Sequence, residues 1–241
     1  MMPNEVFVIQ KLALATYKSK LPTPIEALNE AWHMLEGLAP KISTDVETLG
    51  LYGAVHKRLW DETKVPLHLD KAIWAHEKGF YIKNDYYNGV NLAYLLNVRA
   101  AQTGDTEPAE AIADFIVAQR TRHRVLRLCE EHLESGPAPQ GADKYWIKAT
   151  MAEAYLGLGD DAKATELLEA AQDVDMSLPS LRSTAPDPGK DLASKLDQYE
   201  ARLRIPEMPH SAVPAWMIQT TEEHLARLRG LLAKSPLNRI K

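Results

Sequence analysis

Residues 151–171, with the sequence MAEAYLGLGDDAKATELLEAA, decide the fold class of this 241-residue chain. Small and apolar side chains recur there at helical spacing on both sides of a short turn, which Gly157, Gly159 and Asp160 mark. One such helix pair cannot bury its own apolar face, so we expect neighbouring pairs to stack on it. The recurring positions are Ala152, Tyr155, Ala164, Leu168 and Ala171.

The spacing of these positions resembles the tetratricopeptide repeat, and three weaker helix pairs precede it. The four repeats are expected at about residues 7–40, 45–84, 85–136 and 141–176, followed by C-terminal helices within residues 190–234. A longer turn is expected at residues 61–69, and sustained strand-like alternation is absent from the sequence. We predict a single all-α domain over residues 1–241, a tetratricopeptide-like right-handed superhelix of about four helix pairs with C-terminal capping helices.

The composition of the chain argues against some classes of binding partner. The chain has 28 basic and 33 acidic residues, so no global field attracts duplex nucleic acid or a membrane surface. The single cysteine, Cys129, excludes an intramolecular disulfide and is expected to be a packing residue. No run approaches the roughly 20 apolar residues of a membrane span, and no leader pattern is present at the start. We expect a cytoplasmic protein that binds neither membranes nor duplex nucleic acid.

The sequence offers no converging catalytic or metal-binding groups. The stretches around His132 and His224 lack the His-Glu-x-x-His spacing of zinc proteases. His56 has no further ligands at metal-binding spacing, so we expect it to be a hydrogen-bonded core residue. We therefore expect a binding module with no enzymatic activity, no metal and no cofactor.

Three motifs are more specific than the repeat itself. They are ETLGLYGAVHKR at residues 47–58, KGF at 78–80 and DYYNGVNLA at 85–93, with a weaker echo, PAW, at 214–216. Together they resemble the tetratricopeptide-like TRAFs-binding domain of apoptosis signal-regulating kinases and, more closely, its bacterial relatives, the tetratricopeptide-repeat-containing sensor domains. The resemblance implies a sensor of nucleotide-derived signals in defence or stress systems, whereas the kinase name implies protein partners.

The resemblance also implies that the first helix of each repeat lines a concave groove. Basic side chains there would bind phosphate, amides would contact a base or ribose, and aromatic rings would stack on a planar ligand. The predicted ligand is a nucleotide-like or other phosphorylated anion. The expected ligand-binding residues are Lys11, Lys18, Lys57, Arg58, Tyr86, Asn88, Asn91 and Trp146.

Each of these assignments has an ordinary structural alternative. Lys11 and Lys18 have the alternative of solvated surface lysines, and Asn91 that of a hydrogen bond to a neighbouring turn. Of the aromatic residues, Tyr87 is expected in the core and Tyr86 in the groove. The alternative function is a protein-binding scaffold that recognises a partner peptide or helix. A homodimer through the last helix, by a face that includes Trp216, is a further expectation.

Overall fold

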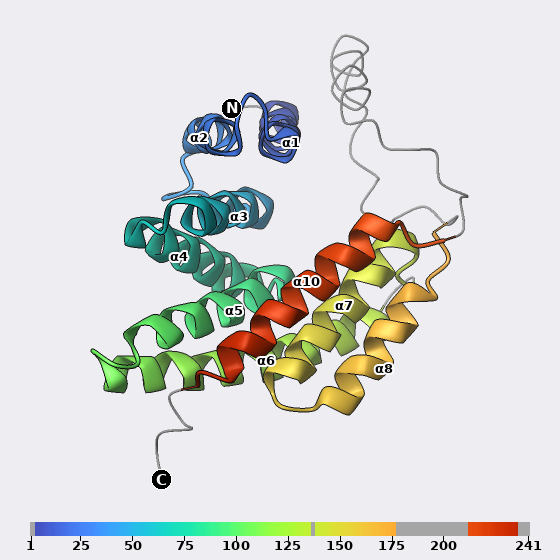
Figure 1. The fold of residues 1–241 in the computed structure, drawn as a ribbon. Helices are drawn as coiled ribbons and strands as arrows, with labels where there is room; N and C mark the ends of the chain where they lie inside the picture. The colour runs from blue at the N-terminus through green and yellow to red at the C-terminus, as the bar shows by residue number, and fades with distance from the viewer. Residues whose placement is uncertain (1–2, 136–137, 177–211, 236–241) are drawn as a thin grey trace. The chain divides into compact units, whose positions relative to one another are not determined.

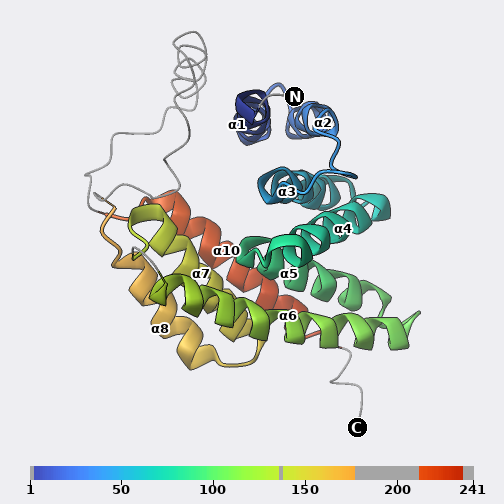
Figure 2. The same ribbon diagram turned by 180° about the vertical axis from the view of Figure 1, so that it is seen from behind.

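The computed structural model of the protein describes residues 3–135, 138–176 and 212–235, and all regular structure in these ranges is α-helical (Figures 1 and 2). This confirms the predicted fold class. The helices are α1 (Pro3–Ser19), α2 (Pro24–Glu36), α3 (Val46–Thr63), α4 (Pro66–Lys83), α5 (Tyr86–Thr103), α6 (Pro108–Glu134), α7 (Gly141–Gly157), α8 (Asp161–Gln172) and α10 (Ala215–Leu232).

Each predicted repeat corresponds to one pair of packed helices, from α1 with α2 to α7 with α8. α6 has 27 residues and continues to Glu134, close to the predicted end. The expected long turn at residues 61–69 is wrong, because α3 continues to Thr63 and α4 begins at Pro66. Lys64 makes this turn possible by adopting the left-handed conformation, with φ of 55°. Of the C-terminal helices expected within residues 190–234, the part before residue 212 lies outside the described residues.

Short polar side chains fix where the helices begin. The carboxylates of Asp45, Asp85 and Asp160 accept hydrogen bonds from backbone N–H groups three residues later, at the starts of α3, α5 and α8. Thr23 caps α2 in the same way, and a proline follows it at the first helical position. The caps of α3 and α5 set the register of two first helices, which carry five of the eight predicted binding residues.

The described chain divides into two compact units. The first unit comprises residues 3–83 with α1 to α4, and the second comprises residues 84–135, 138–176 and 212–235 with α5 to α8 and α10. The expectation of one continuous domain over residues 1–241 stays a prediction.

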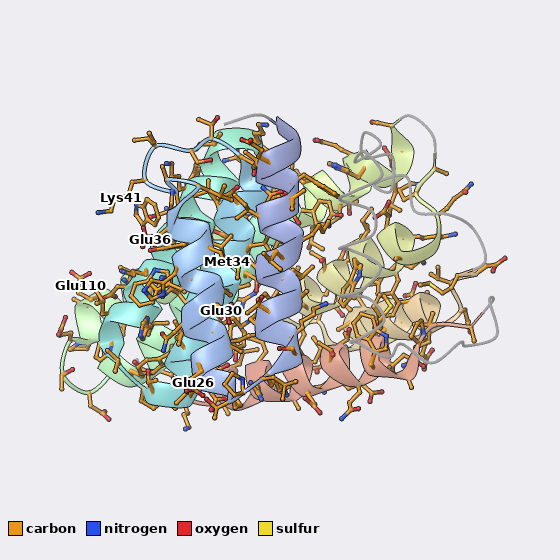
Figure 3. All side chains as sticks on the ribbon, turned by 90° about the horizontal axis from the view of Figure 1, so that it is seen from above. Glu26, Glu30, Met34, Glu36, Lys41 and Glu110 are labelled. Carbon is orange, nitrogen blue, oxygen red and sulfur yellow. The ribbon has the colours of Figure 1, made fainter. Side chains whose placement is uncertain are left out.

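Apolar side chains from α1 to α4 form the core of the first unit, among them Leu28, Leu35, Val55 and Leu59. The opposite face of α2 is acidic and exposed. Figure 3 shows Glu26 and Glu30 following one another along this helix, and both side chains are exposed. Met34, one turn further, is half-buried against the core.

In the second unit, α10 packs against α7 and α5, and Figure 1 shows it running alongside α7 and crossing α5. α10 therefore covers the first helix of the last repeat, α7, and extends over α5 of the repeat before it. Leu225 and Leu228 are buried in this contact, so the apolar face predicted for a homodimer is largely used within the chain.

One close approach and a buried thiol complete the second unit. A Cβ added at Gly157 would lie 2.0 Å from Nε of Arg122, so glycine is needed for the α6 side chain to cross α7. Cys129 is fully buried, and burial raises the pKa of its thiol to about 12. This confirms Cys129 as a packing residue.

Candidate functional site

The predicted binding residues are divided between the two units. Lys11, Lys18, Lys57 and Arg58 belong to the first unit, on α1 and α3. The others, Tyr86, Asn88, Asn91 and Trp146, belong to the second unit, on α5 and α7. Each group is therefore considered within its own unit.

In the first unit, Lys11, Lys18 and Arg58 interact electrostatically, and we call these three residues the basic cluster. Lys18 is exposed at the end of α1; partial desolvation lowers its pKa, and the positive charges of Arg58 and Lys11 act in the same direction. Arg58 lies near this end of α1, because its Cζ is 4.8 Å from the ring centre of Tyr17, the residue before Lys18. Lys11 lies about two helical turns earlier, with its Nζ 5.3 Å from the centre of the Phe7 ring.

The guanidinium of Arg58 is held in place by two contacts. Its Nη1 donates a hydrogen bond of 3.0 Å to the carbonyl oxygen of Ala54, and its Cζ lies 4.8 Å from the centre of the Tyr17 ring. Cation–π contact of this kind favours a fixed orientation of the guanidinium plane. Tyr17 is buried, and burial raises the pKa of its hydroxyl while the charge of Arg58 opposes that rise.

Tyr17 was not among the predicted site residues, because its position in the repeat is that of an ordinary core residue. Its ring serves both purposes, since it belongs to the core of the first unit and supports Arg58. Lys57 was predicted but is not among the principal charges that act on Lys18 or Tyr17. It lies half-buried on α3, about 100° around the helix from Arg58.

The burial of the two tyrosines of the DYYNGVNLA motif is the reverse of the prediction. Tyr86 is buried, with 4% of its surface exposed, and its ring meets that of His132 edge to face at 5.2 Å. Tyr87 is 43% exposed, whereas the sequence placed it in the core. The cause is the register set by Asp85, which caps α5 and turns the first helical residue, Tyr86, toward α6.

The two asparagines of this motif act within their own helix. Asn88 is 1% exposed, and both its backbone N–H and its Nδ2 donate to Oδ1 of Asp85. The prediction that Asn88 lines an open wall is therefore wrong. Nδ2 of Asn91 donates a 3.0 Å hydrogen bond to the carbonyl of Tyr87, which agrees with the structural alternative for this residue.

Trp146, the last predicted residue, is 37% exposed on α7. Its nearest aromatic neighbours are Tyr145, at 5.0 Å between ring centres, and Trp216 of α10, at 6.5 Å. Trp216 is also exposed, so the two tryptophans form a small aromatic surface beside the start of α10. The basic cluster of the first unit has no counterpart among the predicted residues of the second.

The KGF motif has a structural explanation. Nζ of Lys78 donates to the backbone carbonyls of Pro40 and Lys41, at 3.0 and 2.7 Å, and lies 5.5 Å from the centre of the Trp74 ring. Lys78 therefore fastens the connection between α2 and α3 to α4. This specific motif stabilises the fold and does not extend the basic cluster.

His56 is fully buried, as predicted, and forms a pair that the sequence did not reveal. Its Nδ1 lies 2.9 Å from Nδ1 of His68, and the aromatic rings of Trp32 and Tyr52 surround it. Nε2 of His56 is buried with no hydrogen-bond partner, so we place the proton on Nδ1, which donates to His68. Burial lowers the pKa of His56 to about 3, with the charges of Lys71 and His68 acting in the same direction.

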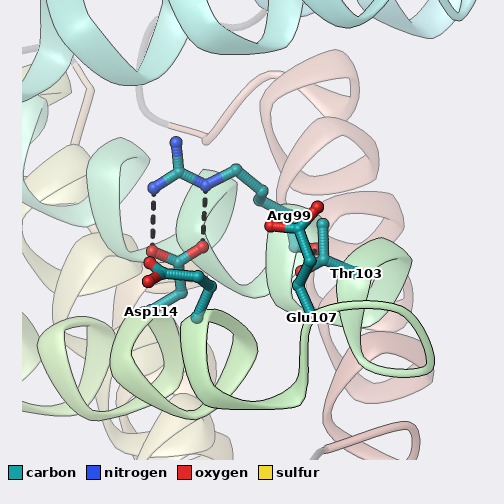
Figure 4. A pocket seen from close by; sticks show the side chains of 5 residues that line it. Arg99, Thr103, Glu107 and Asp114 are labelled. Carbon is teal, nitrogen blue, oxygen red and sulfur yellow. Dashed lines mark hydrogen bonds and ion pairs between the residues drawn. The ribbon is translucent and has the colours of Figure 1, made fainter.

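A hollow in the second unit is lined by Arg99, Thr103, Glu107, Glu110 and Asp114 (Figure 4). Arg99 is already engaged, because its Nε and Nη2 donate to the two carboxylate oxygens of Asp114 at 2.7 and 2.8 Å. The remaining charged side chains of the lining are acidic. The hollow is therefore unsuited to a phosphorylated ligand, and the bidentate pair joins α5 to α6.

Two further properties of the described ranges concern metals and membranes. These ranges contain no group of three or more histidine, cysteine, aspartate or glutamate side chains placed to hold a metal ion. None of their helices combines the length and the apolar character that a membrane crossing requires.

The comparisons with known proteins concern mainly the first unit. A family model described as Tetratricopeptide Repeats-Sensor matches residues 1–96, which include α1 to α4 and part of α5. A search of curated proteins found no match, and a search of solved structures found none either. The relationship to the TRAFs-binding domain of kinases stays a prediction. The N-terminal part of the chain is thus similar to tetratricopeptide repeat sensor domains, a type of sensor or interaction module that is typically non-catalytic.

Proposed function

We propose that the first unit senses a nucleotide-like or other phosphorylated anion, which binds at the basic cluster of Lys11, Lys18 and Arg58. The observation that carries this proposal is the position of Arg58 against Tyr17, next to Lys18, together with the effect of the charges of Arg58 and Lys11 on the pKa of Lys18. Holding like charges together costs free energy, and a bound polyanion relieves that cost. The similarity of residues 1–96 to sensor domains supports the same conclusion.

The chemistry of the cluster suits phosphate. A guanidinium offers five N–H donors in a planar fork that matches two phosphate oxygens, and one donor of Arg58 is used by Ala54. Tyr17 supports the guanidinium from one side, so the fork is oriented before a ligand arrives. Lys11 and Lys18 act as point charges that add affinity with little directional demand.

This binding step is the basis of the wider role that the resemblance implies, the control of a signalling or defence system. Anion binding to the folded state would stabilise it, and a ligand at about 100 times its dissociation constant adds roughly 2.7 kcal/mol to the free energy of unfolding. The proposal therefore predicts a thermal shift with the correct ligand.

The test is a thermal-shift screen of the full chain, followed by calorimetric titration of each compound that shifts the transition. The compounds are mononucleotides, cyclic and linear oligonucleotides, NAD, ADP-ribose derivatives and inorganic phosphate. Lys18→Ala and Arg58→Ala are expected to weaken binding at least tenfold. Lys83→Ala is the matched control, because it removes one exposed positive charge at the end of α4 and should leave the affinity unchanged.

Two results would contradict the proposal. Full affinity in both the Lys18→Ala and Arg58→Ala proteins would remove the site from the basic cluster. No shift with any compound would favour the alternative function, a scaffold that binds a partner peptide or helix.

A further inference from the structure

One face of α3 carries opposite charges at its two ends. Because of their spacing of four, three and four residues, four side chains share this face: Glu47, Leu51, Ala54 and Arg58. Leu51 and Ala54 in the middle are buried, whereas Glu47 and Arg58 at the ends are exposed. Anion binding at the basic cluster accounts for Arg58 and leaves Glu47 unexplained.

Side-chain contacts show that α1 runs beside α3 in the same direction. In the middle of α1, Nε2 of Gln10 donates a hydrogen bond of 2.8 Å to Oγ1 of Thr48. Further along, the ring centre of Tyr17 lies 4.8 Å from Cζ of Arg58. Tyr17 follows Gln10 by seven residues, which corresponds to about 10 Å along the helix. Glu47, next to Thr48, therefore lies about 10 Å before the guanidinium of Arg58 along these two helices.

The end of this surface near Glu47 differs from the cationic end. Lys11 follows Gln10 on α1, so it lies level with Glu47, and its Nζ is 5.3 Å from the centre of the Phe7 ring. One positive and one negative charge thus balance at this end, and Phe7 adds a half-buried aromatic ring. At the other end, the charges that α1 and α3 present have the same sign. The surface is therefore cationic at one end and nearly neutral at the other.

The carboxylate of Glu47 is accessible to a ligand. Glu47 is exposed on the first turn of α3, and within the ranges that the structure describes it makes no hydrogen bond and no ion pair. An acidic residue in a first turn also stabilises its helix, so exposure alone assigns it no further role. The Tyr17 hydroxyl responds to both ends of the α3 face: burial raises its pKa, the charge of Arg58 lowers it and that of Glu47 raises it.

A ligand that covers both ends must match this polarity. A phosphate group fits the cationic end, where lysine and arginine offer only hydrogen-bond donors. A carboxylate only accepts hydrogen bonds, so the group opposite Glu47 must donate them and must not be anionic. A chain of phosphates would place negative charge against Glu47, which weakens binding. A nucleotide of adenine or cytosine has phosphate at one end and a donating amino group on its base.

We propose that Glu47 is a specificity-determining residue of the anion site, which selects a nucleoside monophosphate with an amino group on its base and disfavours inorganic polyphosphate. The phosphate binds at Lys18 and Arg58, and the amino group donates to the carboxylate of Glu47. The base then lies at the end of the surface where Phe7 provides an aromatic ring. This inference rests on the proposed function, because it assigns a second contact to the same ligand.

The experiment is calorimetric titration of the full chain with four compounds. They are adenosine monophosphate, purine riboside monophosphate, which lacks the amino group, ribose 5-phosphate and tripolyphosphate. In the native chain, adenosine monophosphate is expected to bind about tenfold tighter than purine riboside monophosphate, the usual effect of one hydrogen bond to a charged group. Glu47→Met should abolish this difference. It should also raise the affinity for tripolyphosphate about threefold, because a repelling negative charge is removed.

Glu30→Met is the matched control, because it removes one exposed negative charge from α2 of the same unit and should leave all four affinities unchanged. Circular dichroism shows whether Glu47→Met keeps its helical content. If it does not, the same gain in tripolyphosphate affinity is required of Glu47→Gln, which keeps the shape of the side chain. Lys18→Ala should weaken all four compounds and keep the preference for the amino group.

Three results would overturn the inference. The first is equal affinity of the native chain for the two purine monophosphates, or a preference that Glu47→Met leaves unchanged. The second is binding of ribose 5-phosphate as tight as that of adenosine monophosphate, because the sugar hydroxyls would then be the donors. The third is no binding of either purine monophosphate while another phosphorylated compound binds at the basic cluster, which would leave the proposed anion site intact. If no phosphorylated compound binds, the proposed function fails as well.

Discussion

The first helices of the two units use their exposed sides differently. In the first unit, α1 and α3 hold the positive charges of Lys11, Lys18 and Arg58 near solvent, whereas the buried polar side chains include the neutral His56. In the second unit, α5 and α7 are covered by α10, and a guanidinium is fully buried beneath them. The same repeat thus provides an open cationic surface in one unit and a filled groove over buried charge in the other.

This difference predicts how the stability of each unit responds to substitutions of its charged residues. Buried charges are costly when a partner is lost, while exposed like charges cost little and respond to salt and ligands. Substitutions in the charge network of the second unit should therefore affect stability strongly. Substitutions in the basic cluster should affect binding more than stability.

The largest expected effect is that of Glu153→Gln in the second unit. This change removes the negative charge that favours the ionised form of the buried Arg122 and that pairs with His224. The buried guanidinium then lacks a nearby negative charge, and we expect a loss of about 1–3 kcal/mol, the usual cost of leaving a buried polar group poorly compensated. Urea unfolding followed by circular dichroism measures this loss.

The double variant Arg122→Met with Glu153→Gln is the control for that prediction. Its loss of stability should be smaller than the sum of the two single losses, because the second change removes the charge that the first leaves unpaired. Simple additivity of the two losses would mean that Arg122 and Glu153 are not coupled.

The second prediction concerns the neutral histidines of the first unit. The pKa of His56 is about 3 in the folded protein, below the ordinary value of 6.5, and the pKa of His68 is lowered as well. Between these two values the unfolded state binds more protons than the folded state, so stability falls as the pH falls from about 6.5 toward 3. The loss for His56 alone approaches about 1.4 kcal/mol per pH unit within this window.

Other charged and polar groups surround His56, and the variants in this test leave them in place. Lys71 faces both histidines from α4, and Glu36 accepts hydrogen bonds from Trp32 and Tyr52, which outweigh desolvation and lower the pKa of that carboxyl. Urea unfolding of His56→Leu across pH 7 to 5 should show a flatter pH dependence than the native chain. His33→Gln, at an exposed position on α2, should keep the native slope. If the stability of His56→Leu depends on pH as steeply as that of the native chain, the His56–His68 pair is not the source of the acid sensitivity.

The third prediction concerns Lys78, whose replacement should have an effect of intermediate size on stability. Lys78→Ala removes two hydrogen bonds to backbone carbonyls and a contact with Trp74, and we expect a loss of about 1–2 kcal/mol. Thermal unfolding measures the change, with Lys83→Ala as a control for the loss of one positive charge. A loss as small as that of the control would mean that Lys78 does not fasten the connection between α2 and α3.

The same features explain how far the sequence could be interpreted. Helix pairs and their boundaries follow from local periodicity and caps, which is why residues 151–171 led to the correct fold class. The convergence of Lys18 and Arg58 followed from the repeat register. The reversal of Tyr86 and Tyr87 is a one-residue error in the start of α5, and a cap at Asp85 read from the sequence would have corrected it.

Other features depend on contacts that periodicity does not encode. The position of α10 on α5 and α7 joins residues far apart in the chain, such as Tyr145 and Thr221. Both an end cap and a groove-filling helix need one apolar face, so the amphipathic pattern of residues 215–232 cannot distinguish them. The pairing of His56 with His68 depends similarly on how α3 packs against α4.

The smallest predicted effect has the opposite sign and tests the basic cluster most directly. Burial and two neighbouring cations lower the pKa of Lys18, so folding disfavours its charged form at neutral pH. Lys18→Gln should therefore raise stability slightly, by less than about 1 kcal/mol at low salt, and the gain should shrink as salt screens the repulsion. Paired thermal scans at 20 mM and 500 mM salt measure this difference, because the Debye length falls from roughly 20 Å at the lower salt concentration to about 4 Å at the higher one. If Lys18 has only a structural role, its replacement lowers the stability of the protein. If Lys18 is held in place for an anion, its replacement raises the stability and weakens anion binding. Reduced stability of Lys18→Gln at both salt concentrations would show that the contacts of Lys18 within the chain outweigh the repulsion, and the argument for a preorganised anion site would fail.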